Sequence, residues 1–162
     1  MSKPKYRLQP VLEIRVQARQ AAARAVSGRR EELAEAEAEL VRRGDEVAAC
    51  RVRQAAAQEE MFDEAARGAE ARRLVTHRAY LADLRHIERE LSSRYDQQRA
   101  AVTLVEGELE RAVATLLEAA KEVQVIESHH RSWRERTGRE EGRRAQKLSD
   151  EVAALTRQHR RG

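Results

Sequence analysis

Apolar residues recur every three or four positions along almost the whole chain, which is the spacing of one face of an α-helix. In columns of seven, the first such stripe, seam 1, has Leu12, Arg19, Val26, Leu33, Leu40, Val47, Gln54 and Met61 at its a positions, and Leu8, Ala22, Ala36, Cys50 and Ala57 among its d positions. A heptad repeat sustained over this length predicts a coiled-coil helix at about residues 8–67.

A second stripe, seam 2, is more strongly apolar and begins at Leu81. It continues through Leu84, Leu91, Tyr95, Val102, Val105, Leu109, Ala112, Leu116, Ala119, Val123, Ile126 and Trp133. This pattern predicts a second long helix at about residues 77–136.

The two seams are separated by "ARGAEARRLVTH", in which Gly68 can end a helix and Thr76 can cap a new one. We place a chain reversal at about residues 68–76. Each seam alone would expose an apolar stripe that the other can cover, so the sequence predicts an all-α fold, a long antiparallel two-helix coiled-coil hairpin, as a single domain over residues 1–162. The alternative is one continuous helix that dimerises in parallel. The hairpin is favoured because Gly68 interrupts the pattern near the centre of the chain.

Residues 137–162 have a weaker pattern. Gly138 and Gly142 each destabilise a helix by about 1 kcal/mol relative to alanine. Leu148, Val152 and Leu155 then resume an i, i+4, i+7 stripe. We expect a helical but frayed C-terminal tail.

The composition excludes a compact globular domain. Charged residues make up 37% of the chain and aromatic residues only 3%, which is typical of long helices and coiled coils. No run approaches the roughly 18 apolar residues that a membrane span needs, and the N-terminus lacks the apolar segment of a secretion signal. A cytoplasmic protein is therefore expected.

Charge is distributed unevenly along the chain. Residues 1–30 carry a net charge of +7, residues 31–70 of −7, residues 71–130 of −1, and residues 131–162 of +5. An antiparallel hairpin brings the first and last segments to the same end. The hairpin therefore predicts a basic terminal end and an acidic remainder.

Catalytic chemistry is not indicated. Phosphate-binding loops, dinucleotide fingerprints, CxxC pairs and HExxH motifs are absent from the sequence. His129 and His130 are adjacent, so on a helix they point about 100° apart and do not form an i, i+4 metal-binding pair. We expect no enzyme, no cofactor and no metal site.

Several stretches resemble one family. The opening "YRLQPVLEIRVQAR" resembles the F-x-L-Q-x-L-L-x-x-R start of the FliJ family of flagellar export proteins, which are related to the YscO-type stalk of injectisome type III secretion. The stretches "YLADL", "LLEAAKEVQVIESHHRSWRE" and "QKLSDEVAAL" are similar to later signatures of the family. The resemblance covers nearly the whole chain and leaves open whether a flagellum or an injectisome is served.

The resemblance implies a function. FliJ-like proteins form the central stalk of a type III export apparatus: their terminal end enters a hexameric export ATPase, the rod reaches toward a membrane export gate protein, and they handle export chaperones. By this resemblance the chain is a non-enzymatic, cytoplasmic stalk, peripheral to the cytoplasmic face of the inner membrane through the export apparatus. Neither nucleic acid nor direct membrane insertion is expected.

Two surfaces are expected to contact partners. The basic terminal end, which should gather mutually repelling arginines at the ATPase ring, consists of Arg15, Arg19, Arg131, Arg134 and Arg136. The surface near the reversal, which would contact the export gate unless its side chains only widen the seams, consists of Phe62, Tyr80, Leu84 and Ile87. The large residues expected to hold the seams together are Leu12, Val26, Leu33, Leu40, Val47, Leu91, Val102, Val105, Leu109, Leu116, Val123 and Ile126.

Two other functions compete with the stalk. A structural or adaptor coiled coil unrelated to secretion would have no affinity for a hexameric ATPase. Nucleic-acid binding through the basic end is disfavoured, because aromatic residues that could stack on bases are almost absent and the acidic remainder would repel phosphate.

Overall fold

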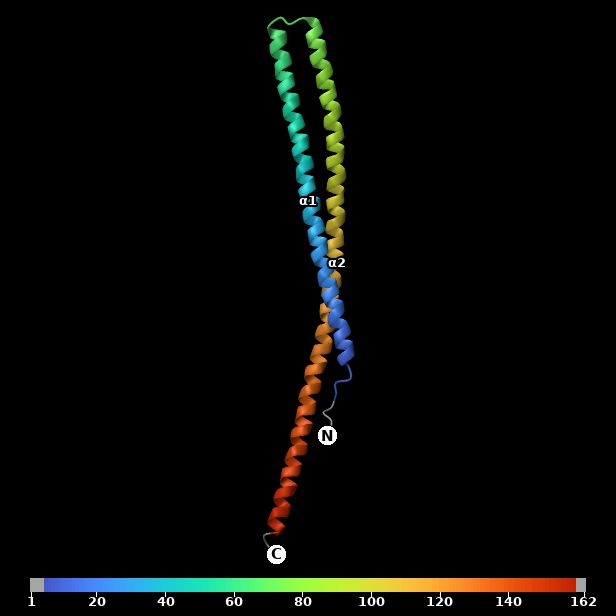
Figure 1. Cartoon of the computed structure of the whole chain (residues 1–162), viewed down its shortest axis with the longest axis vertical. Coiled ribbons are helices and arrows are strands. Elements are labelled where there is room, and N and C mark those ends of the chain that lie inside the picture. The colour runs from blue at the N-terminus through green and yellow to red at the C-terminus, as the bar shows by residue number, and fades with distance from the viewer. Residues whose placement is uncertain (1–4, 160–162) are drawn as a thin grey trace. The chain divides into compact units, whose positions relative to one another are not determined.

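A computed structural model describes residues 5–159 of the chain, with side chains up to residue 156. It contains two helices, α1 (Gln9–Ala66) and α2 (Ala71–His159), and no strand within the described residues. Figure 1 shows α1 and α2 joined by one short connection. The predicted all-α, two-helix hairpin is confirmed.

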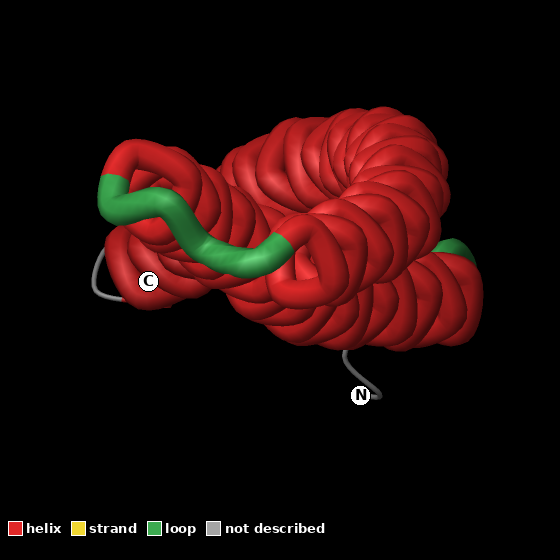
Figure 2. The backbone as a smooth tube through the Cα atoms, turned by 90° about the horizontal axis from the view of Figure 1, so that it is seen from above, coloured by secondary structure: helices red, strands yellow, loops and turns green. Residues whose placement is uncertain are grey.

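The reversal takes only four residues, 67–70. Figure 2 draws it as a green loop that joins the ends of the two helices. Gly68 has a φ of 79°, a left-handed conformation that disfavours other residues. Its amide donates to the Ala65 carbonyl at 3.1 Å, and the Ala69 amide donates to the Glu64 carbonyl at 3.0 Å. These two bonds form a Schellman motif, which ends α1.

The second helix begins earlier than the sequence pattern suggested. The Glu70 carbonyl already accepts the amides of Arg73 and Leu74, at 2.9 and 3.3 Å, so α2 starts at Ala71 instead of about residue 77. Thr76 lies inside α2, where its hydroxyl donates to the Arg72 carbonyl at 3.1 Å, and it does not cap the helix.

The chain divides into two compact units. The terminal unit comprises Met1–Arg24 and Val113–Gly162, and the reversal unit comprises Ala25–Ala112. Each contains a segment of α1 and a segment of α2, and each is described by itself below. The predicted single domain stays a prediction.

Burial follows the heptad pattern in both units, apart from Tyr6, which is buried outside the pattern, and Leu8, a d position that is 39% exposed. The buried hydrophobic residues are Tyr6, Val26, Val47, Cys50, Ala57, Leu81, Leu84, Val102 and Val123. The twelve large residues expected in the seams are all either buried or half-buried. The core of each unit is therefore a narrow line of side chains between two helices.

In the reversal unit, polar side chains cross from one helix to the other. Gln98 donates to the Ala36 carbonyl at 2.9 Å. Gln54 donates to the Leu84 carbonyl at 3.1 Å, beside a cluster in which Met61 packs against the buried Ala57, Leu81 and Leu84. Each glutamine amide satisfies a carbonyl of the opposite helix only in this alignment, so these bonds favour one register of α1 against α2.

Glu88 is held by two donors from α1. Two hydrogen bonds lower the pKa of the Glu88 carboxyl below its usual value of 4.5. The larger effect comes from Arg51 at 2.7 Å and the smaller from Gln54 at 3.0 Å. Because the folded-state pKa is depressed, the stabilising contribution of Glu88 is present above the unfolded-state pKa. It is lost as the pH falls through the folded-state pKa.

We expect the Glu88→Gln variant to show a flatter decline of stability in acid than the wild type. Urea midpoints measured between pH 3 and pH 7 should fall less steeply for the variant below about pH 4.5. Glu37→Gln, which changes an exposed carboxylate with no ion pair, should leave the wild-type profile in place. Superimposable profiles of the wild type and Glu88→Gln would contradict the prediction.

In the terminal unit, aromatic rings hold the start of α1 against α2. The Tyr6 hydroxyl lies 2.8 Å from His129 Nδ1 and 3.4 Å from the Ile126 carbonyl oxygen. The Tyr6 ring stacks on His130 at 4.3 Å and lies 5.2 Å from Trp133, measured between ring centroids. We call these four rings the Tyr6 clamp.

Beyond the Tyr6 clamp, α2 continues to His159 without a break at Gly138 or Gly142. Its side chains between residues 138 and 156 are exposed, apart from a half-buried Ala153. The apolar stripe of Leu148, Val152 and Leu155 is more than 60% exposed at each position. The expected tail is thus a regular helix over its described residues.

Candidate functional site

The arginines predicted for the basic end do not form one cluster. Arg15 donates to Glu122 at 2.8 Å, so this cation is neutralised inside the terminal unit, and Arg19 is half-buried. Arg131, Arg134 and Arg136 are exposed on α2 and form no ion pair with any residue that the structure describes. Arg136 donates to the Ser132 carbonyl at 3.3 Å.

The spacing along α2 separates the two groups. Arg15 is fixed at the level of Glu122, and Arg131 is nine residues further along the same helix, which corresponds to about 13 Å. This distance exceeds the Debye length of about 8 Å at physiological salt. The five arginines therefore form two separate groups, Arg15 with Arg19 and the three on α2, and the expected mutual repulsion among all five does not arise. Only the three on α2 carry exposed, unpaired charge.

The exposed basic stretch is longer than predicted. Arg143, Arg144 and Lys147 follow on the same helix, and all three are exposed without an ion pair, whereas Arg139 contacts Glu135 at 3.8 Å. The net charge of +5 over residues 131–162 was the signal that could have identified them. We call Arg131, Arg134, Arg136, Arg143, Arg144 and Lys147 together the basic stretch.

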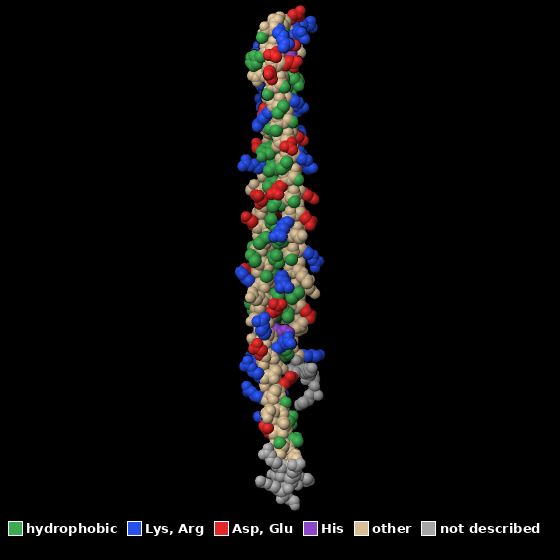
Figure 3. Space-filling view, turned by 90° about the vertical axis from the view of Figure 1, so that its left-hand side faces the viewer, with side chains coloured by type: hydrophobic (Ala, Val, Ile, Leu, Met, Phe, Trp, Pro, Cys, Tyr) green, Lys and Arg blue, Asp and Glu red, His purple; other side chains and the backbone are tan. Residues whose placement is uncertain are grey.

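Charge differs between the two units as a whole. The sequence of the terminal unit contains 17 Lys and Arg and nine Asp and Glu, a net charge of +8. The reversal unit contains 15 and 19, a net charge of −4. In Figure 3 both signs are interspersed over the visible face, so the difference reflects an excess of one sign in each unit and not a uniformly charged surface.

The apolar residues predicted near the reversal lie in two different environments. Phe62, Tyr80 and Ile87 are exposed, with Ile87 at 41%. Leu84, by contrast, is only 4% exposed because it packs on Ala57 inside the reversal unit. Leu84 is therefore not part of the exposed surface that the sequence pattern placed there.

Val75 was missed as a candidate, although it is 65% exposed. It lies early in α2, in the segment that the sequence pattern assigned to the reversal, where no seam position was expected. We call Phe62, Val75, Tyr80 and Ile87 the exposed apolar residues of the reversal unit; Val75 lies about 140° around α2 from Tyr80 and therefore on a different face.

The described residues form open surface pockets lined largely by charged and polar side chains. One is lined by Glu127, His130, Arg131, Arg134 and Glu135, all of them on α2. Within residues 5–159, neither helix has a stretch apolar enough to cross a lipid bilayer. The arrangement suits contacts with other macromolecules through exposed charged and apolar side chains.

Comparisons with known proteins bear on the fold and the family of the chain. A search of the curated proteins gave no match. Among solved structures, the chain is similar to one described as that of a proposed YscO homologue, CT670 from Chlamydia trachomatis. That match has a TM-score of 0.82 and 24% identity, and it covers 96% of each chain, which shows a shared fold. The family model of the YscO-like proteins matches residues 3–161, so the chain belongs to the YscO-like family of type III secretion-related stalk proteins.

Proposed function

We propose that this chain is the central stalk of a type III protein export ATPase complex and couples the hexameric ATPase to the membrane export gate. Membership of the YscO-like family, a structural and non-catalytic family, supports the proposal. In this proposal the protein has no enzymatic activity, cofactor or nucleic-acid partner. It acts at the cytoplasmic face of the inner membrane through the export apparatus and also receives export chaperones.

The basic stretch of α2 determines which end of the stalk we assign to the ATPase. Its charges are unpaired, and it belongs to a unit of net charge +8. After the Tyr6 clamp, α2 continues as a single helix, about 10–12 Å across with its side chains. A single helix is narrower than a helix pair and fits a narrower opening. We therefore assign the terminal unit to the centre of the ATPase ring.

The exposed apolar residues of the reversal unit support assigning this unit to the export gate. Phe62, Tyr80 and Ile87 are exposed, and none of them is buried by the packing of α1 on α2. Exposed aromatic and aliphatic side chains are common anchors of protein interfaces. In this proposal the two units bind different partners by different chemistry, charge in one and apolar contact in the other.

The test is charge reversal at Arg131, Arg134 and Arg136 together. Association with the purified export ATPase should slow by about tenfold at low salt, because attraction between opposite charges mainly accelerates the encounter. The salt dependence of the association rate should become flatter, and stimulation of ATP hydrolysis should fall. Biolayer interferometry at several salt concentrations and a phosphate-release assay measure these quantities.

A matched control makes the same change in the reversal unit. Arg78, Arg85 and Arg99 are exposed and have no ion pair, so reversing all three alters the total charge equally. This control should associate with the ATPase at close to the wild-type rate. Equal rates and equal stimulation for both triple variants would refute the assignment of the terminal unit to the ring. A wild-type chain without affinity for the ATPase would instead indicate a structural coiled coil.

A further inference from the structure

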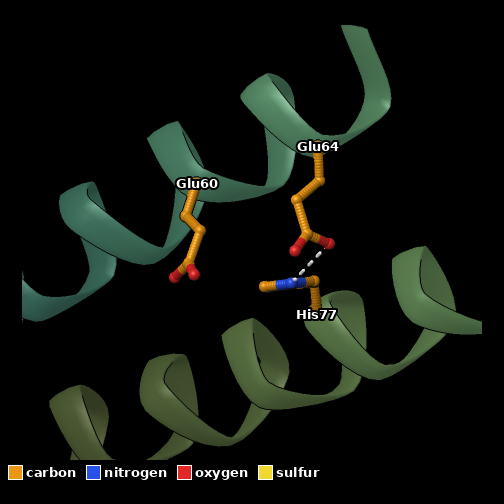
Figure 4. Close-up of side chains that lie close together, drawn as sticks. All are labelled: Glu60, Glu64 and His77. Carbon is orange, nitrogen blue, oxygen red and sulfur yellow. Dashed lines mark hydrogen bonds and ion pairs between the residues drawn. The ribbon is translucent and has the colours of Figure 1, made fainter. Parts of the chain in front are cut away.

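Beside the reversal, three potential metal ligands from two helices point toward one another, as Figure 4 shows. Glu60 and Glu64 belong to α1, and their spacing of four residues places them on one face of the helix. His77 belongs to α2 and faces them. One ligand atom from each of the three side chains lies within 4.8 Å of the other two.

Two of the three ligands already have the separation that a shared metal requires. His77 Nε2 lies 3.1 Å from Glu64 Oε2. Nitrogen and oxygen ligands bind zinc at about 2.0–2.2 Å, so two ligands of one tetrahedral ion lie roughly 3.3 Å apart. A zinc ion bound by both atoms lies to one side of the line that joins them, so the two side chains turn toward the ion while this nitrogen and this oxygen stay close to their present separation.

The surroundings hold these two side chains in place. The His77 and Glu64 side chains are only 20% and 19% exposed. Glu64 also accepts the Ala69 amide through its backbone carbonyl, which fixes its position in the Schellman motif. Less conformational entropy is lost on binding when ligands are already ordered.

The remaining contacts leave room for an ion. Arg73 lies 3.4 Å from the other carboxylate oxygen of Glu64, Oε1, so Oε2 remains available. Glu60 is exposed, and its carboxylate already has an oxygen within 4.8 Å of the ligand atoms of Glu64 and His77. Water can complete the coordination, as in zinc sites with three protein ligands.

We infer that Glu60, Glu64 and His77 form a binding site for a divalent transition-metal ion, best suited to Zn²⁺, which links α1 to α2 beside the reversal. The imidazole is the reason for this choice of metal, because Mg²⁺ and Ca²⁺ bind almost entirely through oxygen. The bound ion adds a cross-link between the helices at the end where the chain turns. This proposal departs from the expectation, based on the spacing of His129 and His130, that the chain has no metal site.

The test is titration of the full chain with Zn²⁺ by isothermal calorimetry. The wild type should bind one ion at this site, and both His77→Gln and Glu64→Gln should weaken binding by about tenfold or more. Arg73→Gln should strengthen binding severalfold, because it removes a neighbouring cation. Saturating Zn²⁺ should raise the melting temperature of the wild type but not that of His77→Gln.

Two control variants separate this site from weaker ones elsewhere in the chain. His86 and Glu90 form a more exposed pair on α2 alone, with 3.4 Å between His86 Nε2 and Glu90 Oε1, so His86→Gln should bind Zn²⁺ like the wild type. The double variant His129→Gln, His130→Gln should do the same. Circular dichroism verifies that each variant is helical before titration.

The inference is overturned if the wild type does not bind Zn²⁺, or if His77→Gln binds as tightly as His86→Gln. Should His77→Gln lose helicity, Arg73→Gln decides the question, because tighter binding supports the site and unchanged binding refutes it.

Discussion

Replacing Val123 with aspartate is expected to release α1 from α2 in the terminal unit. The Val123 side chain is completely buried, and no buried charged group is available among the described residues to pair with a carboxylate. An uncompensated buried charge costs about 3–5 kcal/mol. Trypsin should then cut after Arg15, Arg19 and Arg24 roughly 100-fold faster or more, since each 1.4 kcal/mol changes the open population tenfold.

The control for this experiment lies two residues away. Val125 is 69% exposed on the same helix, so Val125→Asp introduces the same charge without burying it. Its cleavage rates should remain close to those of the wild type. Equal protection of Val123→Asp and Val125→Asp would show that the contact between α1 and α2 in this unit does not depend on Val123.

The second large effect is expected from Leu84→Ala in the reversal unit. The Leu84 side chain is buried with Ala57 and Leu81, and removing it leaves a cavity that two neighbouring helices can only partly close. Such truncations cost about 2–5 kcal/mol. The hydrogen bond from Gln54 uses the backbone carbonyl of Leu84 and is therefore retained in the variant. The urea midpoint should fall clearly below that of the wild type.

Leu104→Ala provides the matched control, because Leu104 lies in the same unit and is 61% exposed. Its effect on the free energy of unfolding should remain within about 0.5 kcal/mol. A small effect of Leu84→Ala together with tight binding to the export gate by the wild type would restore Leu84 to the docking surface. A large loss of stability supports its place in the core.

Heptad spacing was sufficient to predict the two helices and the residues between them. Val26, Val47, Val102 and Val123 occupy predicted seam positions and are all buried. The period of the pattern determines which side of each helix is apolar, and two apolar sides of similar length favour burial against each other. This prediction needed no knowledge of any particular contact.

The details near the reversal depend on backbone hydrogen bonds that side-chain patterns do not encode. Thr76 is a common N-cap residue, but the Glu70 carbonyl begins the hydrogen bonding of α2 six positions earlier. Gly68 correctly indicated the turn, because a positive φ favours glycine and a glycine can be recognised in the sequence. The sequence therefore located the turn but not the residue at which α2 begins.

The pairing of charges across the two helices also could not be predicted from the sequence. A heptad pattern leaves the alignment of α1 against α2 open by whole multiples of seven residues. The partners of Arg15 and of His77 depend on that alignment, and the structure gives them as Glu122 and Glu64. Hence the arginine assigned to an ATPase contact was already paired, and the ligand cluster near the reversal was not anticipated.

The connectivity of the hairpin also affects how the protein is made. His77 contacts a partner 13 residues away in sequence, whereas Tyr6 contacts His129, 123 residues later. At a synthesis rate of about 5–20 residues per second, that interval lasts roughly 6–25 s. Tyr6 is therefore synthesised well before its partner His129, and the apolar side of α1 stays open to other proteins in the cell until enough of α2 has emerged to cover it.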